Sequence, residues 1–73
     1  MAAWLIVWEI SDLAPIKWVY DTSCYFGGKV AGIEPHPENR LRMMAMVRFE
    51  DREKARVFSQ HARPRGQEPI KEE

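Results

Sequence analysis

The sequence predicts an α+β domain in which an antiparallel sheet packs on one or two helices. Every second residue of 40–50 is apolar, which indicates a strand whose buried face packs under helices and carries Leu41, Met43, Ala45, Val47 and Phe49. Residues 51–62 then place Ala55, Val57 and Phe58 at helical spacing. Asp51 or Glu50 can cap that helix. With 73 residues, the chain makes one domain at most.

The first strand is expected at residues 3–10, which are rich in Trp, Ile and Val. One of its faces carries Trp4, Ile6, Trp8 and Ile10. The other face is also largely apolar. We therefore expect this strand in the middle of the sheet, covered on both faces or covered on one and exposed for contacts on the other.

Residues 11–28 allow two interpretations. As a helix, they begin at Ser11 as N-cap, tolerate Pro15 in the first turn and end at Gly27-Gly28. The apolar stripe of that helix would be Leu13, Ile16, Val19, Tyr20, Ser23 and Cys24. As a hairpin, residues 16–20 and 24–26 form strands around a turn.

Residues 29–33 are expected to form a short strand, and the glycines around them suggest a sheet edge, a bulge or a close backbone approach. Two prolines make residues 34–39 a loop, so residues 40–50 return antiparallel. Residues 1–65 would form the domain. Residues 66–73 would be a flexible polar tail, or would add a short edge strand near Ile70.

The element order is thus β-α-β-β-α, the ferredoxin-like or split β-α-β order. The hairpin interpretation gives instead a four-stranded antiparallel meander with a C-terminal helix. In either case one face of an antiparallel sheet packs on helix.

Residues 42–49 read Arg-Met-Met-Ala-Met-Val-Arg-Phe, and residues 5–10 form an apolar strand before them. Residues 5–60 thereby resemble the RNA-recognition motif, whose octamer has a basic first residue, a small fourth and an aromatic eighth. The family's base-stacking positions hold Met44 and Met46 here, and Ile6 in the first strand. The resemblance therefore implies the fold without the stacking aromatics.

The predicted face of residues 40–50 that points away from the helices is the candidate site. It carries Arg40, Arg42, Met44, Met46 and Arg48. Methionine adapts to partners and arginine donates planar hydrogen bonds, so this face suits contact with a protein partner or with a second copy. The alternative is that another element covers both methionines.

Trp18 falls off the apolar stripe of the helical interpretation, where it would be an exposed anchor for a partner. In the hairpin interpretation it belongs to the core. We include it among the candidate partner-binding residues.

Charge is uneven along a chain whose formal net charge is zero. Residues 40–65 contain eight basic and three acidic residues, whereas the segments on both sides are acidic. Candidate contacts to nucleic acid in this basic region are Arg52, Arg56, Arg63 and Arg65. The alternative is a solvated helix face of mixed charge.

Catalytic and metal chemistry is not indicated. Cys24, His36 and His61 are too widely spaced for a zinc pattern, and Gly27-Gly28 lacks the other residues of a phosphate loop. We expect no enzyme activity, metal or cofactor. One cysteine and no apolar run of membrane-spanning length predict a cytoplasmic protein without membrane contact.

These observations favour a small, non-enzymatic binding protein that acts through protein–protein contacts. We expect an inhibitor or modulator of a larger partner, of the kind that phages and mobile elements encode. Self-association is compatible with the same surface. The alternative is a nucleic-acid-binding module that uses an arginine-rich sheet face.

Overall fold

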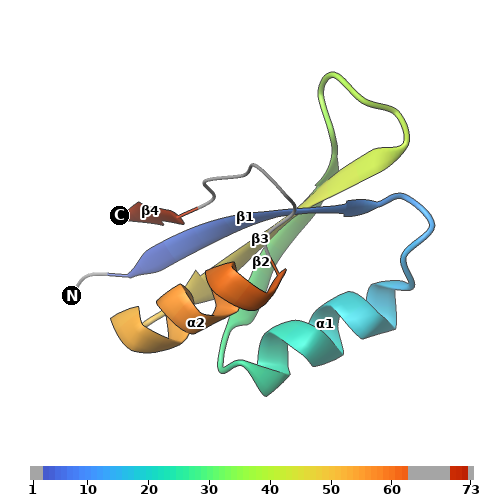
Figure 1. Cartoon of the computed structure of the whole chain (residues 1–73). Coiled ribbons are helices and arrows are strands. Elements are labelled where there is room, and N and C mark those ends of the chain that lie inside the picture. The colour runs from blue at the N-terminus through green and yellow to red at the C-terminus, as the bar shows by residue number, and fades with distance from the viewer. Residues whose placement is uncertain (1–2, 63–69, 73) are drawn as a thin grey trace.

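Four strands and two helices follow one another in the ferredoxin-like order (Figure 1). The computed structural model describes residues 3–62 and 70–72. The elements are β1 (Trp4–Ser11), α1 (Ile16–Tyr25), β2 (Lys29–Pro35), β3 (Arg42–Phe49), α2 (Arg52–Ala62) and β4 (Ile70–Glu72). The sheet order is β2-β3-β1-β4, and all neighbours are antiparallel. The predicted β-α-β-β-α order is confirmed, and the meander alternative is wrong.

The two faces of the sheet differ because side chains alternate along each strand. On one face of the central strand β1, Ile6, Trp8 and Ile10 are buried. They share a single core cluster with Val19 of α1 and Phe58 of α2. Both helices therefore cover this face, and they lie on the same side of the sheet in Figure 1.

Helix α1 begins at Ile16, five residues later than Ser11, the predicted N-cap. The Oγ of Ser11 accepts the backbone N–H of Leu13 (3.1 Å), and its carbonyl accepts that of Ala14 (3.0 Å). These bonds make a turn, and Pro15 is extended before the helix starts. Leu13 is therefore 87% exposed, so its predicted place in the buried stripe is wrong.

The C-terminal end of α1 is formed as predicted by Gly27-Gly28. The N–H of Gly28 donates to the carbonyl of Ser23 (2.8 Å), and the N–H of Gly27 to that of Cys24 (2.9 Å). This is the Schellman pattern, which requires a left-handed residue after the helix. Gly27 supplies it with a φ of 86°.

Strand β3 begins at Arg42, so the prediction that Arg40 and Leu41 belong to it is wrong. The side chain of Asn39 accepts the N–H of Leu41 (2.9 Å), and its carbonyl accepts that of Arg42 (3.1 Å). These bonds hold Arg40 and Leu41 in a local turn, and the two residues therefore do not pair with a neighbouring strand. Leu41 is 73% exposed instead of packing under the helices.

The two edges of the sheet are formed by β2 and β4. Strand β2 pairs with β3 through a register shift between Val30 and Gly32, which is the predicted bulge. Strand β4 pairs with residues 4–6 of β1, and it overlaps the edge strand that was one interpretation of the C-terminal end. Residues 63–69 and 73, which include most of the predicted tail, lie outside the described residues.

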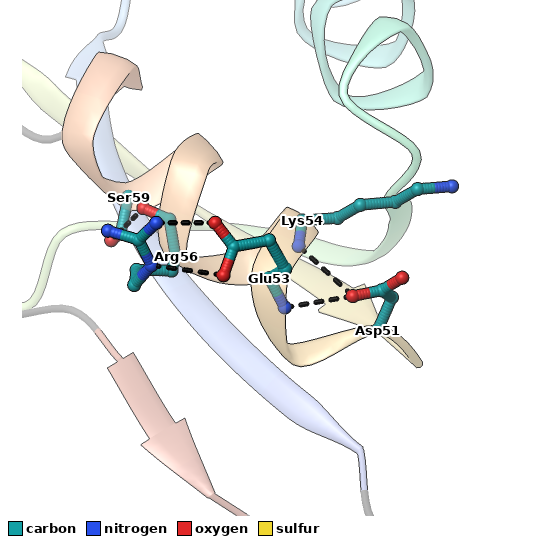
Figure 2. Close-up of polar contacts among 5 residues, drawn as sticks. All are labelled: Asp51, Glu53, Lys54, Arg56 and Ser59. Atoms are coloured by element: carbon teal, nitrogen blue, oxygen red, sulfur yellow. Dashed lines mark hydrogen bonds and ion pairs between the residues drawn. The ribbon is translucent and has the colours of Figure 1, made fainter.

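Asp51 caps α2, which settles the choice between Asp51 and Glu50. Its Oδ1 accepts the backbone N–H groups of Glu53 (2.8 Å) and Lys54 (3.3 Å) (Figure 2). Without these bonds, two amide groups of the first turn lose their protein acceptor.

We expect Asp51→Ala to lower the free energy of unfolding by about 1 kcal/mol, because a capping oxygen is lost. Chemical denaturation followed by tryptophan fluorescence measures the change. Glu50→Ala is the matched control, since it removes the neighbouring carboxylate without removing the cap. Equal losses in the two variants would contradict the assignment of Asp51 as the cap.

Candidate binding surface

The face of the sheet opposite the helices, here called the open sheet face, is the candidate site. Its side chains come from alternate positions of the three longer strands. They are Leu5, Val7 and Glu9 of β1, Lys29, Gly32 and Glu34 of β2, and Arg42, Met44, Met46 and Arg48 of β3. None of them belongs to the core cluster. The sheet thus has one face packed on helices and one face available for contacts.

Strand register arranges the open sheet face in rows. A basic row holds Lys29 and Arg48 beside Leu5. The next row is uncharged, with Gly32, Met46 and Val7, and the row after it is acidic at both ends, with Glu34, Met44 and Glu9. The face therefore has an apolar centre between a basic row and an acidic row.

Both methionines of this face are partly buried, as are Leu5 and Val7 beside them on β1. Met46 stands opposite Val7, and Met44 stands opposite Glu9. Apolar groups at the centre of a surface with charges around them match the general anatomy of protein interfaces.

His36 joins the acidic row from the loop after β2. Its Nε2 lies 3.4 Å from Oε2 of Glu9, and both side chains are largely buried. Its Nδ1 accepts the backbone N–H of Glu38 (3.0 Å). The sequence suggested only a loop residue, because the contact depends on the pairing of β1, β2 and β3 and not on local spacing.

The predicted site residues do not form one surface. Arg42, Met44, Met46 and Arg48 lie together on the open sheet face, whereas Arg40 lies in the preceding turn. Trp18 is on α1 and therefore on the covered side of the sheet. It is 47% exposed, and its ring packs against that of buried Trp8 at 5.2 Å.

The arginines of α2 lie on the covered side as well. The guanidinium of Arg56 binds the carboxylate of Glu53, which lowers the pKa of Glu53 and raises that of Arg56 (Figure 2). Arg52 is exposed, and Arg63 and Arg65 lie outside the described residues. Arginines of α2 and of β3 thus face opposite sides of the sheet.

Helix α1 exposes more apolar surface than its predicted stripe implies. Ile16 and Tyr20, which were expected in the core, are half exposed, and Tyr25 is almost fully exposed. On the outer side of this helix, Lys17 binds Asp21 through a 2.6 Å contact, which raises the pKa of Lys17.

An open pocket of about 400 Å³ adjoins the basic row at the end of the sheet. Lys29, Arg48 and Lys54 line it together with Glu50, Asp51 and the Gly27-Gly28 turn. Its charges are mixed. Nothing in the sequence pointed to it, since its walls come from two segments that lie far apart in the chain, residues 27–29 and 48–54.

Within residues 3–62 and 70–72, no three His, Cys, Asp or Glu side chains come close enough to hold a metal ion. The helices of this part of the chain are too short or too polar to cross a membrane. Comparisons with protein-family models, curated proteins and solved structures find no match for this chain.

Proposed function

We propose that this chain is a non-enzymatic binding protein that inhibits or modulates a protein partner by docking its open sheet face. The observation that carries the proposal is the position of Met44 and Met46. Both lie on the face that α1 and α2 leave uncovered, outside the core cluster. Flexible methionine side chains fit irregular partner surfaces well.

The surroundings of the methionines support a protein partner more than nucleic acid. Val7 and Leu5 extend the apolar centre across β1. Glu9 and Glu34 flank Met44, so carboxylates stand where a phosphate backbone would need positive charge. The arginines of α2 cannot join those of β3 on one flat surface, because the sheet lies between them.

The test is capture of partners from a lysate of the native host, with and without nuclease, by immobilised chain. We expect the double change Met44→Ser and Met46→Ser to weaken capture by roughly 10-fold or more, as central apolar contacts dominate binding energy. The matched control is Trp18→Ser, which removes a larger apolar side chain from the other side of the sheet.

Methyl NMR of isotope-labelled methionines provides the second readout. Met43 points to the covered face and packs against the core, so its signal should move least when the captured partner is added. The signals of Met44 and Met46 should move most. Capture that survives the double change, or that nuclease or moderate salt abolishes, would contradict the proposal.

A further inference from the structure

One pair of charges on the open sheet face, Lys29 and Glu34, exchanges places under a two-fold rotation. The basic row at Arg48 and the acidic row at Met44 lie equally far, two residues of β3, from the central row at Met46. Consider two copies packed face to face, with the two-fold axis parallel to the central row and therefore perpendicular to the strands. The basic row of each copy then lies over the acidic row of the other. It brings Lys29 of each copy over Glu34 of the other.

We infer that the occupant of the open sheet face is a second copy of this chain, packed face to face with its strands reversed. The inference rests on the proposed function because it uses the same face, and the second copy would compete there with the protein partner. A two-fold axis along the strands would instead place basic row on basic row, so charge selects the reversed arrangement. The resulting interface is isologous, as in most symmetric dimers.

The charges of Lys29 and Glu34 are available for such contacts. Both side chains are exposed, and no ion pair joins either of them to another described residue. The formal net charge of the chain is zero, so two copies have no overall repulsion to overcome. Between the charged rows, Met46 and Val7 of the two copies would form the apolar contact.

The size of the face predicts a weak dimer. The three longer strands, about 4.8 Å apart, and rows over about seven residues cover roughly 350 Å² per copy. The total of about 700 Å² is smaller than that of standard specific complexes, so we expect a dissociation constant in the upper micromolar range. Dimerisation would hide Met44 and Met46 and thereby limit access of other partners.

Variants in which the charges of Lys29 and Glu34 are exchanged test this inference. Their dimerisation is measured by sedimentation equilibrium at protein concentrations from about 1 to 500 μM. Lys29→Glu and Glu34→Lys should each weaken dimerisation by about 10-fold, because each opposes like charges across the interface. The variant that carries both changes restores the pairing and should return to within about 3-fold of the original chain. Circular dichroism confirms that each variant is folded.

Lys17→Glu is the matched control for Lys29→Glu, because it makes the same change in net charge on the outer side of α1. It should leave dimerisation unchanged. Three results would overturn the inference: a monomer at every concentration, no recovery in the double exchange, or a dimer weakened by Lys17→Glu instead. A monomer would leave the proposed function intact, since that is judged by partner capture with Met44 and Met46 replaced.

Discussion

Phe58→Ala is expected to remove a large share of the stability of the domain. The side chain of Phe58 is completely buried, and its ring lies 5.1 Å from Phe49, 5.4 Å from Trp8 and 5.5 Å from Phe26. Removing such a ring costs about 3–5 kcal/mol, because the cavity is only partly refilled. A chain of this length has a total stability of roughly 4–11 kcal/mol.

Urea denaturation followed by tryptophan fluorescence measures the loss, and Trp8 reports on the cluster directly. Leu13→Ala is the control, since this side chain is exposed and its removal should change stability by less than about 0.5 kcal/mol. A loss below about 1 kcal/mol in Phe58→Ala would mean that α2 does not pack on the sheet through this ring.

Gly28→Ala is expected to be nearly as damaging, although it adds only one methyl group. A Cβ at this position would lie 2.5 Å from Cζ of Phe49 and 2.6 Å from Cγ1 of Val47. Both side chains are fully buried, so neither can move without disturbing the core. We expect a loss of about 3 kcal/mol, at the upper end for overpacking.

The control is Gly32→Ala in β2, which begins directly after Gly28. Its Cβ would meet only the terminal methyl of Met46, at 3.3 Å, and that flexible end can move away. Stability should change by less than about 1 kcal/mol. Similar losses in both variants would indicate a general cost of replacing glycine in this part of the chain rather than a close approach at Gly28.

The parts of the fold that could be predicted are those in which local signals agree. Every second residue from Met43 to Phe49 is apolar, and Asp51 stands directly before a helical pattern, so β3, α2 and their connection were expected. The start of α1 was missed because Ser11 can cap a helix or close a turn equally well. Asn39 is ambiguous in the same way. It closes a turn before β3, so Arg40 and Leu41 lie in that turn and not in the strand.

The candidate surface was predictable only along β3. Alternation alone placed Arg42, Met44, Met46 and Arg48 on one face. The contribution of β1 and β2 required the strand register, which no local pattern contains. Trp18 was grouped with that face on its amino-acid type, whereas the helix places it on the other side of the sheet.

The bulge between Val30 and Gly32 reverses which face of the sheet the preceding residues of β2 point to. Counted back from Glu34 in steps of two, a regular strand would turn Val30 outward and bury Lys29. The one additional residue, Ala31, reverses that assignment, so Val30 packs against the core and Lys29 stands beside Arg48. A single inserted alanine therefore determines both the apolar filling of the sheet edge and the sign of charge at one end of its outer face.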